Sequence, residues 1–176
     1  GGVMLEEPLW ASGPGEILRH GVALLNEDKD SNRRIALILI DNSVELMMQT
    51  FLNLPKRITG IQISRKQRDE YCASFPSLLD GIEACAGSKI EGLNLGEFEW
   101  FHKIRNQLYH EGNGITVERS LVEIYAEMAK KLFALLFDTT LEVPEKGSMQ
   151  RLGSFLDTWI QIEKTVKEQS STDAEG

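Results

Sequence analysis

The side chains best suited to chemistry gather in one short segment, Phe101-His102-Lys103-Ile104-Arg105-Asn106-Gln107-Leu108-Tyr109-His110. On a helix, His102, Arg105 and Tyr109 lie on one face, at spacings of three and four residues. His110 comes five residues after Arg105, and a glycine-rich stretch follows it. The segment therefore places titratable, cationic and aromatic groups at a helix end beside a loop, where functional residues often occur.

An imidazole and a guanidinium together favour acid–base chemistry on a phosphate ester. Histidine changes charge near neutral pH, and the planar fork of arginine matches two phosphate oxygens. Each residue also has a structural interpretation. Arg105 is placed to pair with an acid or with the helix dipole, and His110 is placed to bond a free carbonyl at the helix end. His102 is more typical of a satisfied, partly buried histidine, and Tyr109 of a packing residue with a polar tip.

Two acidic residues interrupt the most apolar part of the chain, positions 35–52. Asp41 and Glu45 lie four residues apart there, so a helix places them on one face. Buried carboxylates need partners, and Arg105 is the obvious one. We therefore expect Asp41 and Glu45 to orient the site rather than to catalyse.

Other kinds of site find no support in the sequence. There is no glycine-rich phosphate loop and no HExxH pair, and the chain has only three histidines. Its two cysteines, Cys72 and Cys85, form no CxxC pair and are expected to be free thiols. We therefore expect no metal and no cofactor.

Composition suits one globular domain. The 176-residue chain is 41% apolar, 26% charged and carries a net charge of −8, so it has no overall attraction to nucleic acid. Positions 29–68 are the exception, with eight basic residues against three acidic ones. This excess is either a set of solvated helix ends or a face that attracts a polyanion. Because no apolar run approaches ~18 residues and no signal peptide is evident, we expect a cytoplasmic protein without a membrane partner.

The elements that would position these residues are all helical. Apolar periodicity predicts an all-α bundle of about five to six helices, with the helix over 32–54 at its centre. The helix over 65–86 is expected to be kinked or split at Phe75-Pro76. The predicted organisation is an irregular segment over 1–14, a helical domain over 15–138, a linker over 139–148, a C-terminal helix over 149–168 and a disordered tail over 169–176. Within the domain we expect helices over 16–27, 32–54, 65–86, 95–111 and 116–138.

The motif Arg105-Asn106-x-x-x-His110 resembles the Arg-x(4–6)-His motif of the HEPN superfamily (higher eukaryotes and prokaryotes nucleotide-binding domain). The stretch Ala36-x-x-x-x-Asp41-x-x-x-Glu45 is similar to the earlier helix of that family, whose acidic residues face the motif. Helix order over about 16–138 also fits, with an up-and-down core and an extra C-terminal helix. One departure is Gly112, which stands where the HEPN toxins paired with nucleotidyltransferase antitoxins carry a tyrosine.

This resemblance implies a metal-independent endoribonuclease that cleaves RNA through attack of the ribose 2′-hydroxyl. It assigns proton transfer to His110, the phosphate clamp to Arg105 and an orienting role to Asn106. His102, Tyr109 and the two acids would support them. A homodimer, an RNA substrate and a cognate antitoxin or other partner protein, in a toxin–antitoxin or antiviral defence setting, are further implications. Many HEPN domains are instead non-catalytic modules for dimerisation, partner binding or nucleotide binding, and this alternative stays open.

Overall fold

The computed structural model describes residues 6–27, 29–111 and 117–143, and within them every regular element is a helix. This confirms the predicted all-α class. A short 3-10 helix, η1 (Leu9–Ala11), precedes seven α-helices. These are α1 (Ser12–Leu25), α2 (Asp30–Asn53), α3 (Lys56–Thr59), α4 (Arg65–Tyr71), α5 (Phe75–Ala86), α6 (Leu95–Glu111) and α7 (Arg119–Phe137).

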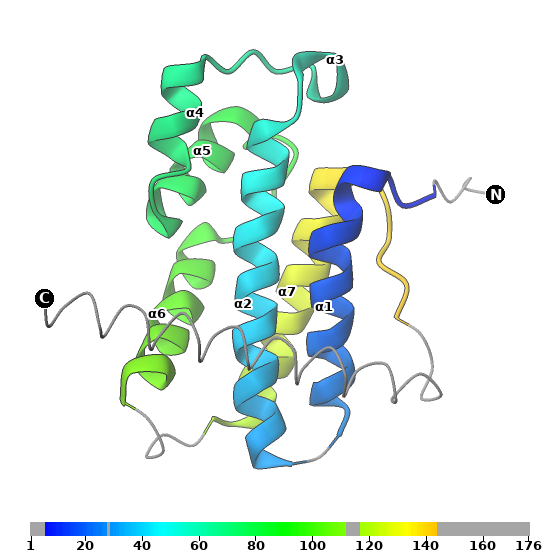
Figure 1. Ribbon diagram of the computed structural model, residues 1–176, viewed down its shortest axis with the longest axis vertical. Coiled ribbons are helices and arrows are strands. Elements are labelled where there is room, and N and C mark those ends of the chain that lie inside the picture. Colours follow the sequence, from blue (N-terminus) through cyan, green and yellow to red (C-terminus); the bar gives the residue numbers. More distant parts are fainter. Residues whose placement is uncertain (1–5, 28, 112–116, 144–176) are drawn as a thin grey trace, which may run out of the picture. The chain divides into compact units, whose positions relative to one another are not determined.

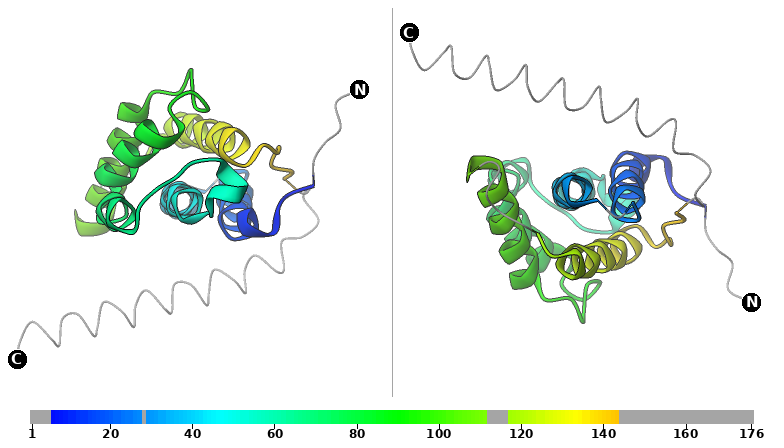
Figure 2. Two further views of the ribbon diagram at one scale, coloured as in Figure 1. Left: turned by 90° about the horizontal axis from the view of Figure 1, so that it is seen from above. Right: turned by 90° about the horizontal axis from the view of Figure 1, so that it is seen from below.

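Helix α2 is the centre of the bundle. It packs against α1, α7, α5 and α6, and Figures 1 and 2 show these helices arranged around it. Its apolar side chains are at most 1% exposed at Ala36, Leu37, Leu39, Ile40, Val44, Met47, Met48 and Leu52. By length and composition α2 could also cross a membrane, but most of its apolar stretch is buried in the bundle, as in the core helix of a soluble protein. A helix surrounded by neighbours must be apolar on nearly all sides.

The N-terminal part of the bundle begins earlier than the sequence predicted. Residues 1–14 were expected to be irregular, but η1 starts at Leu9 and α1 at Ser12. Pro14 therefore lies in the first turn of α1, where a backbone N–H has no helical partner and proline is tolerated. The proline marks the start of the helix and not a break before it.

The predicted break at Phe75-Pro76 is confirmed as a split between α4 and α5. The Ser64 side chain accepts from the Gln67 backbone N–H, and the Gln67 side chain accepts from the Ser64 N–H, which starts α4. Ser74 caps α5 in turn by accepting from the Ser77 N–H. The additional short helix α3 follows directly on Pro55, so the bundle has more pieces than expected.

Helices α6 and α7 carry the motif segment and its neighbours. Asn94 starts α6, because its Oδ1 accepts from the Gly96 N–H at 2.9 Å. Helix α7 begins at Arg119, three residues after the start of the predicted helix over 116–138, and residue 116 lies outside the described residues. It ends at Phe137, and Asp138 follows with a left-handed backbone of φ 54°. All of the described residues belong to one compact unit. The predicted C-terminal helix and tail, and the second half of the predicted linker (144–148), lie outside the described residues.

Gly81 lies where α4 and α5 approach each other closely, so a substitution at this position tests their packing. A Cβ at this position would lie 2.7 Å from Cγ of Tyr71 and 3.0 Å from Cδ1 of Leu52. We expect Gly81→Ala to lower the free energy of unfolding by about 1–3 kcal/mol, because a packed core must move to admit the methyl group. Gly13→Ala is the control, since its nearest neighbour would be Leu46 Cδ2 at 3.8 Å. Urea denaturation of both variants measures the difference, and equal stabilities would contradict the packing described here.

A candidate active site around Asp41 and Arg105

The carboxylate of Asp41, in the middle of α2, is completely buried. Three side chains compensate its charge. Tyr125 donates its hydroxyl to Oδ1 at 2.7 Å, and His102 Nδ1 bonds Oδ2 at 2.8 Å. Arg105 Nε lies 3.7 Å from the same Oδ2, in an ion pair. Asp41 therefore connects α2 to two residues of α6 and one of α7, and it is the anchor of the predicted motif segment.

His102 is held in one orientation. Since a carboxylate only accepts hydrogen bonds, Nδ1 of His102 carries the proton in this pair. The ring also stacks on Phe75, with centroids 3.8 Å apart and planes 2° from parallel. Its Nε2 makes no hydrogen bond to any described residue, and 17% of the side chain is exposed. The pair thus presents an imidazole with a fixed tautomer and one nitrogen unused.

The guanidinium of Arg105 is fixed mainly by neutral oxygens. One terminal nitrogen donates to Asn42 Oδ1 at 3.0 Å, and the other donates to Asn106 Oδ1 at 3.2 Å. The Tyr109 ring lies below it, 5.0 Å from the guanidinium carbon. The Nε atom of Arg105 is buried without a hydrogen bond, and 19% of the Arg105 side chain is exposed. Two of the five N–H donors are used in these bonds, so others remain for an anion.

Tyr125 and Asn42 belong to this site, although the sequence analysis did not select them. The Tyr125 ring is fully buried and stacks on Phe101 with centroids 4.4 Å apart. Burial raises the pKa of Tyr125 well above its ordinary value, and the adjacent Asp41 carboxylate raises it further. Tyr125 could have been selected from the sequence, because it lies in the apolar stripe of α7 and a buried phenol needs a polar partner. Asn42 could have been selected because it directly follows the buried acid Asp41.

The two remaining predicted residues lie apart from the Asp41 contacts. Glu45 is half-buried and makes no hydrogen bond or ion pair with the described residues, although its charge helps to raise the pKa of Tyr125. His110 is exposed in the last turn of α6, with its ring against Tyr109. Because α6 continues through Glu111, five residues rotate His110 by about 140° from Arg105. Among the described residues no interaction joins Arg105 to His110.

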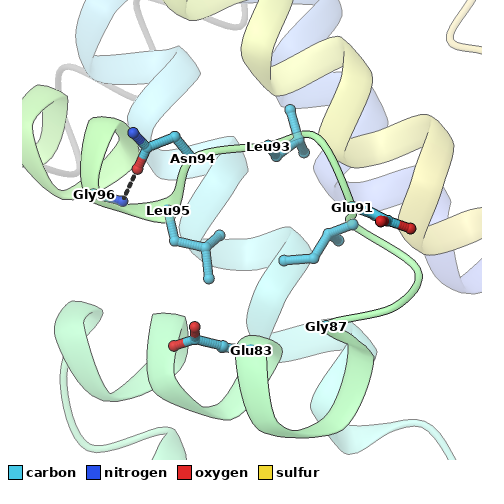
Figure 3. A pocket seen from close by; sticks show the side chains of 8 residues that line it. Glu83, Gly87, Glu91, Leu93, Asn94, Leu95 and Gly96 are labelled. Carbon is cyan, nitrogen blue, oxygen red and sulfur yellow. Dashed lines mark hydrogen bonds between the residues drawn. The ribbon is translucent and has the colours of Figure 1, made fainter.

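A separate hollow of about 520 Å³ lies between the end of α5 and the start of α6 (Figure 3). Glu83 and Glu91 are its ionisable side chains, and the Asn94 amide there is used to start α6. None of the predicted site residues lines it. No group of three or more His, Cys, Asp or Glu in the described part of the chain is placed to hold a metal ion. The cluster around Asp41 therefore remains the candidate site.

No family model matches this chain, and the comparisons with curated proteins and with solved structures give no match either. A function therefore has to be argued from the contacts around Asp41 and Arg105.

Tyr125→Phe tests the compensation of the buried carboxylate. Removal of the hydroxyl takes one of the hydrogen-bond donors from Asp41, and we expect a loss of about 1.5–3 kcal/mol in the free energy of unfolding near neutral pH. The wild-type protein should also lose stability above about pH 10, because there the unfolded state ionises its tyrosine while the folded state resists. That alkaline loss should be smaller in the variant. Tyr71→Phe is the control, since its hydroxyl has no hydrogen bond to a described residue. Thermal unfolding between pH 7 and 11 measures both effects, and a Tyr125 variant as stable as the Tyr71 variant contradicts them.

Proposed function

We propose that this protein is a metal-independent endoribonuclease of HEPN type, in which Arg105 binds the scissile phosphate and His110 transfers protons. The proposal rests on how the guanidinium of Arg105 is held and on how little of its charge is neutralised. Its guanidinium is fixed by Asn42, Asn106 and Tyr109 and is partly exposed, while the carboxylate beside it is shared with two other donors. A fixed cation with unused donors stabilises the negative charge on the non-bridging phosphate oxygens in the transition state.

The proposed reaction needs one phosphate clamp and two proton transfers. The ribose 2′-oxygen attacks the adjacent phosphorus and forms a bond to it, while the bond from phosphorus to the 5′-oxygen breaks. A base takes the proton of the 2′-hydroxyl, and an acid gives a proton to the leaving 5′-oxygen. The products are a 2′,3′-cyclic phosphate end and a 5′-hydroxyl end. Histidine serves as base or acid near neutral pH, and His110 is exposed where RNA could reach it.

The proposal requires two copies of the chain. Within one copy, His110 is rotated away from Arg105 around α6, so the two side chains would act together only when a second copy brings its own α6 alongside. A homodimer supplies this arrangement, with His110 of one copy beside Arg105 of the other. His102 lies next to Arg105 in the same copy, and we assign it, together with Asp41, the role of holding that residue in place.

A second candidate function is that of a non-catalytic HEPN-like module for dimerisation or partner binding. The ion pair between Arg105 and the fully buried Asp41 favours it, because a buried acid needs such a partner whether or not the protein is an enzyme. In that case Arg105→Ala would mainly unfold the protein, at a cost of about 3–5 kcal/mol. The nuclease proposal instead expects Arg105→Ala to lose RNA cleavage in protein that is still folded, since Tyr125 and His102 still bond Asp41.

Cleavage of mixed RNA in EDTA is the direct test. We expect the wild-type protein to produce ends with a cyclic phosphate, and Arg105→Ala and His110→Ala to lose at least about 100-fold in rate, the typical share of one acid–base group or one oxyanion donor. Lys103→Ala is the matched control, because this exposed cation lies on α6 and pairs only with Glu99. Gel electrophoresis of labelled RNA measures the rates, with thermal unfolding run beside it. Wild-type protein that leaves RNA intact would end the nuclease proposal.

Mixing the two inactive variants tests the arrangement across the dimer. A heterodimer of Arg105→Ala with His110→Ala contains one site with both residues intact and one site with neither. Recovery of up to about half of the wild-type rate per dimer is therefore expected, after co-refolding or prolonged mixing. Neither variant mixed with itself should recover. Absence of recovery in mixtures that contain heterodimer would place both residues of a working site in one chain, against the arrangement proposed here.

A further inference from the structure

Cations at one end of the bundle have almost no acidic partners. Most described lysines and arginines pair with a carboxylate, as Arg19 does with Glu7 and Lys89 with Asp138. Seven of the described lysines and arginines make no ion pair with a described residue, and six of these seven lie within positions 29–68. The seven are Lys29, Arg34, Lys56, Arg57, Arg65, Arg68 and Lys131. In a chain of net charge −8, this distribution concentrates positive potential at a few places.

The structure separates the basic positions 29–68 into two groups. Lys29, Arg33 and Arg34 stand at the start of α2, whereas the other five stand beyond its end, on α3 and α4 (Figure 1). With 24 residues, α2 is about 36 Å long, so these groups cannot form one face. We call the second group the basic cap: Lys56, Arg57, Arg65, Lys66 and Arg68. Asp69 and Glu70 are its only acidic neighbours on α3 and α4, and Glu70 pairs with Lys66.

Helix-end chemistry explains only part of the basic cap. Arg68 donates from Nε to the Leu52 carbonyl oxygen at 3.2 Å, so it satisfies the last turn of α2. The cap also has a defined backbone, because Ser64 and Gln67 close the start of α4 and Gly60 takes a left-handed conformation after α3. Lys56, Arg57 and Arg65 take no part in these bonds and are exposed. Their three charged groups make no ion pair or side-chain hydrogen bond with a described residue.

We propose that the basic cap binds the phosphate backbone of the RNA substrate and holds the strand on the path to Arg105. The identification of the polyanion as RNA rests on the proposed function. Helix α5 packs against both α4 and α6, so α4 with Arg65 and the motif helix lie on one side of α2, whereas α3 lies beyond the end of α2 on the side of α1 (Figure 1). An RNA strand that crosses the end of α2 can contact Lys56 and Arg57 on α3 and then Arg65 on α4, and its continuation along the side formed by α4, α5 and α6 leads toward Arg105.

An anionic membrane fits these residues less well than RNA does. A helix that lies in a membrane interface needs a continuous apolar face beside its cations. On α3 and α4 the exposed large apolar side chain is Ile58, at 37%, and α3 has only four residues. Phosphates on a flexible strand, in contrast, need only exposed cations at suitable spacings.

Binding to an RNA that cannot be cleaved tests the proposal separately from catalysis. The probe is a fluorescent RNA oligonucleotide in which every 2′-hydroxyl is methylated, titrated in EDTA at several salt concentrations. The cap variant is Lys56→Gln with Arg57→Gln and Arg65→Gln. The matched control removes three other unpaired charges, through Lys29→Gln, Arg34→Gln and Lys131→Gln. Thermal unfolding verifies that both variants are folded, and anionic phosphatidylserine vesicles serve as the second ligand.

The cap variant should bind this RNA on the order of 100-fold more weakly at 0.1 M salt, with a slope of log affinity against log salt reduced by about 2, since each single-strand phosphate contact contributes about 0.7. The control variant should keep most of the wild-type affinity and most of the wild-type salt dependence. Equal loss in the two variants, or loss of vesicle binding alone, overturns the basic cap as an RNA surface. If the wild-type protein binds the methylated RNA through the cap but cleaves no ordinary RNA, the binding surface stands and the ribonuclease proposal fails.

Discussion

The structure of this protein depends on how one buried negative charge is compensated. Asp41 lies on the central helix with no exposed surface, and a carboxylate in such a place is costly unless it is paired and hydrogen-bonded. Its partners come from α6 and α7, so the same bonds that compensate the charge also fix these helices against α2. The position of the motif segment is thus a consequence of charge burial as well as of apolar packing.

The two sides of the Arg105 guanidinium have different environments. On the buried side, Asp41 attracts the guanidinium but accepts its short hydrogen bonds from Tyr125 and His102. On the other side, the two amide oxygens of Asn42 and Asn106 hold the fork without adding negative charge. Arg105 therefore has a defined orientation and a positive charge that is only partly compensated. Sites that bind anions need both properties.

Much of this fold could be predicted from the sequence, because the signals were local. Apolar positions three and four residues apart indicated the helices, and Phe75-Pro76 indicated the split before α5. The irregular segment expected over 1–14 was too long, since a proline such as Pro14 is tolerated in the first turn of a helix although it breaks a helix interior. The partners of Asp41 were harder to find. Tyr125 follows it by 84 residues, and only the packing of α7 against α2 brings the two together. Periodicity states which face a residue occupies but not which residue it meets.

The continuation of α6 through Glu111 has a consequence for control. Because the helix carries His110 around to a different direction from Arg105, the ribonuclease proposed above would have two half-sites and no complete site in a lone chain. Under the proposed arrangement, the catalyst is a species that obeys mass action. At concentrations far below the dissociation constant its amount would grow with the square of the chain concentration, so a newly made, dilute protein would spare the RNA around it until enough copies had met.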